Sequence, residues 1–168
     1  MTFEEEFEKC WDKYELYNGC VTGITKMPRN EQEKYAKQFA EGSEHYYKLL
    51  LELWSRGVET RAGCSGIFET HNERATAYLS IDIFPENRKL LFDLTEKLHA
   101  NGFLDKNRIE YYAGVLRDES LMKMPDWARR VAFYSYKSDR AALEKQQSRQ
   151  DCEDFFKAIY IALLTFGK

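Results

Sequence analysis

Hydrophobic residues recur at every third or fourth position between residues 30 and 54, and this spacing predicts a helix. Asn30, with Glu33 three positions later, fits a variant of the capping box at its start. Gly42 and Ser43 interrupt the pattern, and we expect a kink or break there, because a mid-helix glycine costs about 1 kcal/mol. The apolar face of this helix comprises Tyr35, Phe39, Tyr46, Leu49, Leu50, Leu53 and Trp54.

After Gly57, a typical helix-ending residue, the period changes to that of strands. Apolar and polar residues alternate over residues 60–69 and again over residues 74–84. His71-Asn72 fits the turn between these two runs, and Pro85 marks the end of the second. We therefore predict an antiparallel hairpin. The second strand has an aliphatic face with Ala77, Leu79, Ile81 and Ile83. Its other face is polar and carries Tyr78, Ser80 and Asp82.

The same two periods predict the remaining elements. Helical spacing covers residues 2–17, the stretch from Pro85 to Gly102, and the C-terminal region, where the helix begins either near Ser138 or at Ser148. Alternation predicts further strands over residues 108–116 and 128–137.

The predicted order is α-α-β-β-α-β-β-α, which is typical of an α+β fold. Strands that follow one another closely pair in antiparallel fashion, so we expect a four-stranded antiparallel sheet packed on helices. The length of 168 residues fits a single domain over residues 1–168, with the N-terminal helix and loop of residues 1–29 at its periphery.

Composition narrows the function classes. The net charge of -3 and the pI of about 5.7 differ from the net positive charge and high pI that are typical of nucleic-acid-binding proteins. The sequence has no CxxC pair, no Cys/His pair at zinc-ligand spacing and no glycine-rich phosphate loop, and we expect no cofactor and no metal. Without a signal-peptide pattern or a long apolar stretch, we expect a cytoplasmic protein with reduced thiols and no membrane contact.

Aromatic residues are the most unusual feature of the composition, with 11 Tyr, 11 Phe and 3 Trp. Several tyrosines fall opposite the aliphatic positions of their own strands, beside arginines. Tyrosine and arginine dominate the energetics of binding surfaces, so the polar face of the sheet is the predicted binding surface. Cross-strand pairs that stabilise a half-wet sheet are an equally good interpretation. The predicted binding residues are Arg61, Tyr78, Asp82, Tyr112, Arg130, Tyr134 and Tyr136.

Cys64 and His71 are the candidate catalytic residues, with Glu69 and Asp82 as further polar groups nearby in the sequence. A thiolate nucleophile needs a base or cation beside it. The alternation places Cys64 with Ala62 and Phe68 on the core face, which favours an inert buried thiol. His99 lies near the end of its helix, where it is expected to be solvated or stabilised by the helix dipole.

The step Gly57-Val58-Glu59-Thr60, followed by Cys64-Ser65-Gly66, resembles a pattern in small uncharacterised proteins of bacterial and phage genomes. In that pattern a helix ends at Gly-Ile/Val-x-Thr, and a strand bearing Cys-x-Gly-His follows. This sequence has Ile67 in place of the histidine. The resemblance implies a phage or mobile-element protein that modulates or inhibits a host nucleoprotein or defence enzyme, as anti-CRISPR proteins do.

These observations favour a non-enzymatic binding protein with a protein or nucleoprotein partner, and they leave its oligomeric state open. One alternative is a domain that binds RNA or single strands on the aromatic sheet face, helped by Arg129, Arg130, Lys137 and Arg140. The other alternative is a small enzyme built around Cys64 and His71.

Overall fold

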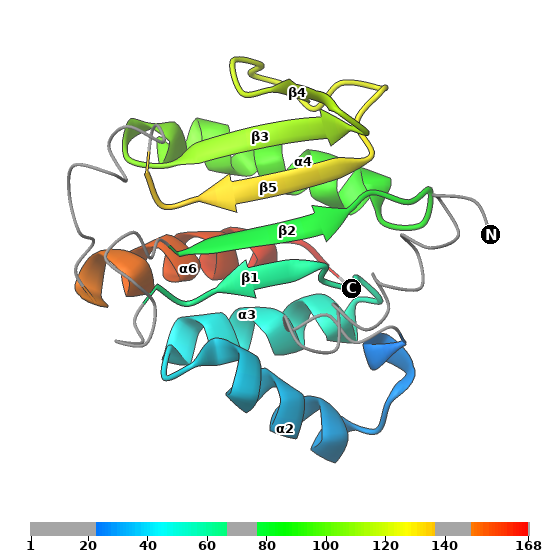
Figure 1. The fold of residues 1–168 in the computed structure, drawn as a ribbon, viewed down its shortest axis with the longest axis vertical. Helices are drawn as coiled ribbons and strands as arrows, with labels where there is room; N and C mark the ends of the chain where they lie inside the picture. The colour runs from blue at the N-terminus through cyan, green and yellow to red at the C-terminus, as the bar shows by residue number, and fades with distance from the viewer. Residues whose placement is uncertain (1–22, 67–76, 137–148, 168) are drawn as a thin grey trace.

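A five-stranded antiparallel sheet lies at the centre of the computed structural model, which describes residues 23–66, 77–136 and 149–167 (Figure 1). The strands follow the spatial order β1-β2-β5-β3-β4, so the last strand in the sequence lies in the middle. The α+β class and the antiparallel sheet are confirmed, but the sheet has five strands where the pattern predicts four. The strands are β1 (Ala62–Cys64), β2 (Tyr78–Asp82), β3 (Arg108–Ala113), β4 (Leu116–Asp118) and β5 (Arg130–Tyr134).

The additional strand comes from a turn at Gly114. The alternation predicts one strand over residues 108–116, whereas β3 ends at Ala113 and β4 begins at Leu116, with Ala113 and Leu116 directly paired. Gly114 has a φ of 59°, in the region that favours glycine and suits the first central position of a two-residue hairpin turn. Because Ala113 and Leu116 are paired, they face the same side of the sheet, whereas one continuous strand would place them on opposite sides.

Helices cover one face of the sheet, with α4 and α6 behind it in the view of Figure 1. Helix α3 packs against α6, α2 packs against α3, and α4 packs against α6. Short 3-10 helices precede α2 and follow α4. The helical segments are η1 (Ile24–Lys26), α2 (Arg29–Ala40), α3 (Glu44–Ser55), α4 (Arg88–Ala100), η2 (Phe103–Asp105) and α6 (Arg149–Leu164).

The helix predicted over residues 30–54 is two helices, α2 and α3. Glu41 and Gly42 both have positive φ, 46° and 88°, which ends the first helix. Ser43 then caps the second, because its hydroxyl accepts a hydrogen bond from the Tyr46 N–H at 3.1 Å. The break was therefore expected at the right place, but the cap predicted at Asn30 is absent: Asn30 lies inside α2, whose N-cap is Pro28.

The core lies between the sheet and the helices. The aliphatic face predicted for β2 is confirmed, since Leu79 and Ile81 are wholly buried. They lie beside the buried core residues Phe133 and Val131 of β5 in the strand register. At β1 the sheet and α3 approach closely: a Cβ on Gly63 would lie 1.9 Å from the Tyr46 hydroxyl oxygen. A glycine is needed at this position for the helix to pack.

The N-terminal helix predicted over residues 2–17, the turn at His71-Asn72 and the stretch before α6 that contains Ser138 and Ser148 lie outside the described residues. The predicted strands over residues 60–69, 74–84 and 128–137 lie partly outside them.

Candidate functional site

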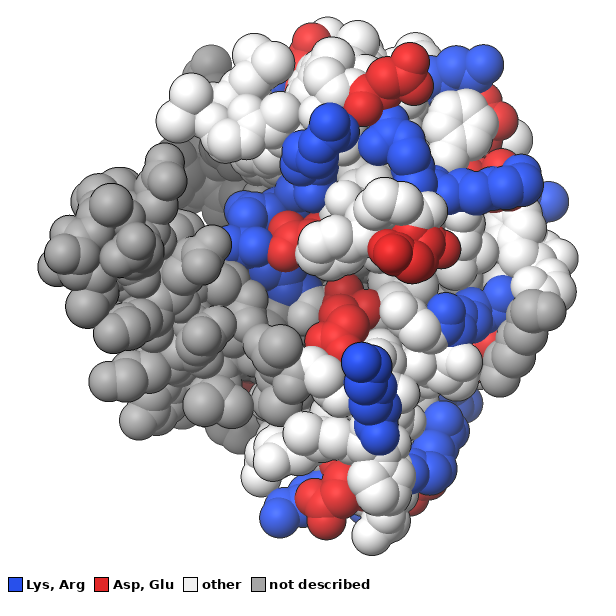
Figure 2. Space-filling view, turned by 90° about the vertical axis from the view of Figure 1, so that its right-hand side faces the viewer, with Lys and Arg blue, Asp and Glu red and all other residues white. Residues whose placement is uncertain are grey.

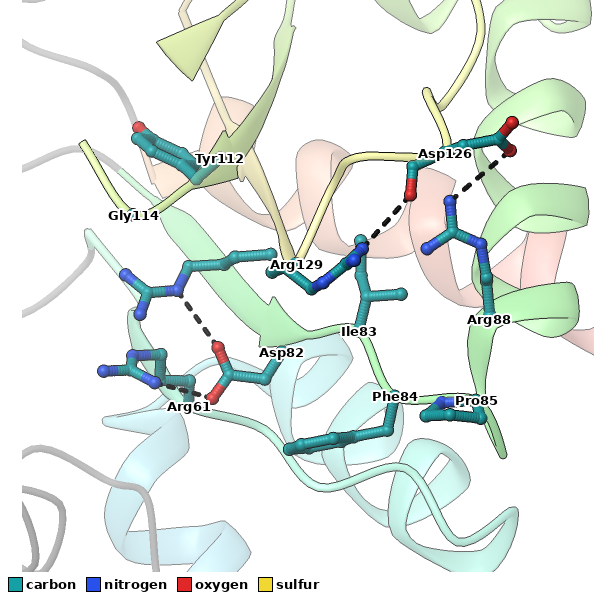
Figure 3. Close-up of a pocket in the computed structure, with 11 residues that line it drawn as sticks. Arg61, Asp82, Ile83, Phe84, Pro85, Arg88, Tyr112, Gly114, Asp126 and Arg129 are labelled. Atoms are coloured by element: carbon teal, nitrogen blue, oxygen red, sulfur yellow. Dashed lines mark hydrogen bonds and ion pairs between the residues drawn. The ribbon is translucent and has the colours of Figure 1, made fainter. Parts of the chain in front are cut away.

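Four of the predicted binding residues meet at one end of the sheet. Tyr112, Arg130 and Asp82 lie directly opposite one another in the register of β3, β5 and β2. Arg61, just before β1, reaches the same aspartate. We call these four residues the strand-end row. Figure 3 shows Arg61 and Asp82 together on one side of a hollow, with Tyr112 above them.

Asp82 holds the strand-end row together. Its two carboxylate oxygens accept separate bonds, one from Arg61 Nη1 at 2.6 Å and one from Arg130 Nε at 3.1 Å. Their side chains are 13% and 34% exposed, and that of Asp82 is 26% exposed. One carboxylate thus fixes two partly exposed guanidinium groups.

Tyr78 and Tyr134 form a second row across the polar face, together with Arg108. The two tyrosines are paired in the register, and their rings stack with centroids 6.0 Å apart. The Arg108 guanidinium carbon lies 4.3 Å from the centroid of the Tyr134 ring, a cation–π contact. Both tyrosines are half-buried and Arg108 is buried. These rings are engaged within the protein, as the interpretation of stabilising cross-strand pairs expects.

The middle of the polar face is buried, and Ser80 and Glu110 are the polar residues there. Glu110 is wholly buried. Its carboxylate pairs with Arg108 Nε at 2.9 Å and Arg117 Nη1 at 3.7 Å, and it accepts a hydrogen bond from the Tyr112 hydroxyl. Burial and the bond to Glu110 raise the pKa of Tyr112. A hydrogen bond to Glu110 likewise raises the pKa of Glu119.

A hollow of about 760 Å³ opens beside the strand-end row. The chain around Phe84 and Pro85, the start of α4 and the loop before β5 complete its wall (Figure 3). Sequence reasoning did not include Phe84 or Arg88 and named Arg129 only within the alternative RNA patch. The polar wall residues are Arg61, Asp82, Arg88, Asp126, Arg129 and Arg130, and the remaining ones are Ile83, Phe84, Pro85, Tyr112 and Gly114.

Charges of both signs are interspersed over the side of the molecule that Figure 2 shows. Blue Lys and Arg side chains lie next to red Asp and Glu side chains there, and no broad field of one sign is visible. A surface of this kind suits a partner that also carries both signs, because complementary patterns of charge fix the orientation of a complex.

Cys64 does not lie on the core face. In the register Cys64 pairs with Tyr78, whereas Gly63 pairs with the core residue Leu79, so the thiol belongs to the polar face and that prediction was wrong. The thiol is nevertheless buried, and burial raises its pKa to about 11. The candidate partners His71 and Glu69 lie outside the described residues.

Tyr136 stands apart from the other predicted binding residues. It follows the end of β5 and is half-buried. Burial raises its pKa, and Cys152 and Asp151 of α6 add to the rise. Because these two groups lie at the start of α6, Tyr136 is close to that helix.

Within the described ranges, no helix combines the length and apolar character needed to cross a bilayer. Among the same residues, no three His, Cys, Asp or Glu side chains lie together as metal ligands would. Comparison of the chain with protein-family models, with curated proteins and with solved structures finds no match. The resemblance of residues 57–66 therefore rests on those residues alone.

Proposed function

We propose that this chain is a non-enzymatic binding protein of the cytoplasm, and that the strand-end row contacts its protein or nucleoprotein partner. One observation carries the proposal: Arg61, Asp82, Tyr112 and Arg130, from separate segments of the chain, meet around one hollow. A role in modulating a host nucleoprotein or defence enzyme follows from the resemblance only and stays a prediction.

The geometry of the row favours binding because it is already assembled. Arginine and tyrosine are the residue types that most often contribute large shares of binding energy. Ordering a long side chain at an interface costs about 0.5–1.5 kcal/mol, and the two bonds to Asp82 reduce that cost for Arg61 and Arg130 before any partner arrives.

The two alternatives have less support. An enzyme that uses the Cys64 thiol needs thiolate near neutral pH, and a pKa of about 11 keeps the thiol protonated. An RNA-binding sheet needs aromatic faces that bases can stack on. Here the Tyr134 ring is stacked on Tyr78 and covered by Arg108.

Affinity capture from the native host, with and without nuclease, tests the proposal. Arg130→Ala is the informative variant, because Arg61 remains to pair with Asp82 and we therefore expect the fold to be retained. We expect partner affinity to fall by about 2 kcal/mol, roughly 30-fold. Arg29→Ala is the matched control: this arginine is 57% exposed on α2, far along the chain from the row, and its loss should leave capture unchanged.

Normal capture by a folded Arg130→Ala variant would place the interface elsewhere. Disappearance of the captured material after nuclease treatment would favour the RNA alternative, and binding should then weaken steeply with salt.

A further inference from the structure

Two arginines in the wall of the hollow share one backbone carbonyl, and we call them the arginine pair. Arg88 Nη1 donates to the Ala128 carbonyl oxygen at 3.2 Å, and Arg129 Nη1 donates to the same oxygen at 3.1 Å. The two nitrogens are therefore no farther apart than the sum of these distances. Because bonds from a guanidinium group to a carboxylate oxygen are about 2.7–2.9 Å long, the two oxygens of one carboxylate can reach both arginines.

Uncharged groups orient the arginine pair. Arg88 also donates to the Pro125 carbonyl at 2.8 Å. Arg129 also donates to the Asp126 carbonyl at 3.1 Å. Within the described residues, these bonds leave the Nε of both arginines and Nη2 of Arg129 without a protein acceptor. A carbonyl fixes the position of a guanidinium group without neutralising it, so the pair keeps both donors and charge for an anion from outside.

Asp126 supplies the negative charge nearest to the arginine pair. Within the part of the chain that the structure describes, it is the single carboxylate at ion-pair distance from either arginine. Its Oδ1 lies 3.8 Å from Arg88 Nη2, and its side chain is fully exposed, so water screens this contact. Figure 3 shows the carboxylate beside Arg88 and the Asp126 backbone beside Arg129. Two positive charges thus face one weakly held negative charge, and one further carboxylate matches the difference.

Exposed apolar side chains accompany the arginine pair around the hollow. Phe84 is 53% exposed and belongs to the same turn of chain as Arg88, whose N–H donates to the Phe84 carbonyl at 2.9 Å. Gly114, another wall residue, is followed by Val115 and Leu116, which are both exposed. Exposed apolar side chains around a concave site are typical of surfaces that contact proteins.

We propose that the hollow docks an acidic side chain of the partner protein, with its carboxylate on Arg88 and Arg129 and a neighbouring aromatic side chain of the partner against Phe84. Aromatic pairs add to the stabilisation that burial provides. The volume of about 760 Å³ is ample for two side chains. A nucleic acid would need a run of cations to match its phosphates, whereas this wall mixes arginines with aspartates. The inference rests on the proposed function, because it names the chemistry of the partner at that surface.

The dipeptide N-acetyl-Asp-Phe-amide tests the inference, titrated into the isotope-labelled full chain and followed by NMR chemical shifts. We expect it to bind about tenfold more tightly than N-acetyl-Asn-Phe-amide, which has the same shape without the charge. Arg129→Ala should bring the two dipeptides to the same affinity. We expect this variant to fold, since the Arg129 side chain is exposed and bonds to carbonyls of its own loop. Phe84→Ala should weaken both dipeptides equally and preserve the tenfold difference.

Asp126→Asn should change the affinity in the opposite direction. It removes the competing carboxylate and retains the backbone carbonyl that holds Arg129, so we expect N-acetyl-Asp-Phe-amide to bind about threefold more tightly. Lys89→Ala is the matched control, because that cation is 88% exposed on α4 and does not line the hollow. Its affinity for both dipeptides should equal that of the original chain.

The inference is overturned if N-acetyl-Asp-Phe-amide does not bind, if it binds no better than its Asn counterpart, or if Arg129→Ala keeps the tenfold difference. A ten-nucleotide oligothymidylate provides the arm for nucleic acid. If it binds more tightly than the dipeptide and Arg129→Ala abolishes this binding, the arginine pair recognises phosphates and the docking of a carboxylate is wrong.

The two proposals fail separately. The titration uses pure protein and pure dipeptides, so its outcome does not depend on any captured partner. Normal capture by Arg130→Ala would contradict the proposed interface even if the dipeptide binds. Reduced capture by Arg130→Ala without any binding of the dipeptide would overturn only the docking of an acidic side chain.

Discussion

The Cys64 thiol gives a direct prediction at the scale of a single residue. Burial raises its pKa to about 11, so thiolate, the reactive form, is scarce at pH 7.4. We expect alkylation of Cys64 by iodoacetamide to be much slower in the folded chain than in urea, and to accelerate as the pH rises towards 11. Peptide mass mapping distinguishes Cys64 from the other cysteines. Equal rates in the folded and unfolded chain would show that the thiol is accessible and revive the enzyme alternative.

Single residues also show what the sequence could and could not predict. A glycine within a strand is typical of close approach by a neighbouring element, and Gly63 is such a position, because the Tyr46 hydroxyl occupies the space of a Cβ. Phe84 and Arg88 were missed, because an aromatic residue before Pro85 and an arginine at a helix start suit many ordinary turns. Only the arrangement of the loops around the hollow shows that they share its wall.

Ser43 connects two helices, and its replacement belongs to the scale of elements. Its hydroxyl accepts from the Tyr46 N–H at the start of α3 and donates to the Glu153 carboxylate of α6. Glu153 also pairs with His45 Nδ1 at 2.7 Å. Ser43→Ala removes the cap and one partner of this carboxylate, so we expect a loss of about 1–2 kcal/mol in the free energy of unfolding, measured by urea denaturation.

Ser55→Ala is the control for this substitution, because Ser55 is exposed and its hydroxyl donates to the Glu52 carbonyl of its own helix. Its effect should stay within about 0.5 kcal/mol. If both serine variants unfold at the same urea concentration, Ser43 neither caps α3 nor anchors α6.

At this scale the sequence predicts the type of each element better than its bounds. Leu79 and Ile81 identify the buried face of β2, because a strand with one buried face alternates strictly. The same rule fails at Gly114, where the chain turns back: Ala113 and Leu116 are paired and share a face, although continued alternation would place them on opposite faces. The tyrosines of the polar face were expected to form either a binding surface or stabilising cross-strand pairs. Which tyrosines lie side by side depends on the order of the strands in the sheet, and no local sequence pattern predicts that order.

For the whole molecule, His99 predicts how stability depends on pH. Burial lowers the pKa of its imidazole from the ordinary 6.5, and the nearby Glu96 offsets only part of this effect. The folded state therefore binds fewer protons than the unfolded state as the pH falls through 6.5. We expect the free energy of unfolding to be retained above that pH and to decrease below it.

His99→Gln isolates this contribution, because the other titrating groups remain the same in both proteins. The variant should lose less stability than the original chain between pH 7.5 and pH 5, as measured by denaturation at a series of pH values. A parallel decline in the two proteins would show that His99 has the same proton affinity in the folded and unfolded states.

The position of β5 has a consequence for the way the protein emerges from the ribosome. This strand joins β2 to β3, yet it is the last of the five to be synthesised, and its Arg130 pairs with an aspartate 48 residues earlier. Until residue 134 has left the exit tunnel, β1-β2 and β3-β4 are separate two-stranded pairs, which are marginal by themselves in water. The pairing of β5 with β2 and β3 requires a long loop to close first, and this requirement slows folding. Between the synthesis of β2 and that of β5, nascent chains of this protein thus carry uncovered aliphatic strand surface, and this is the interval in which a chaperone has the most to protect.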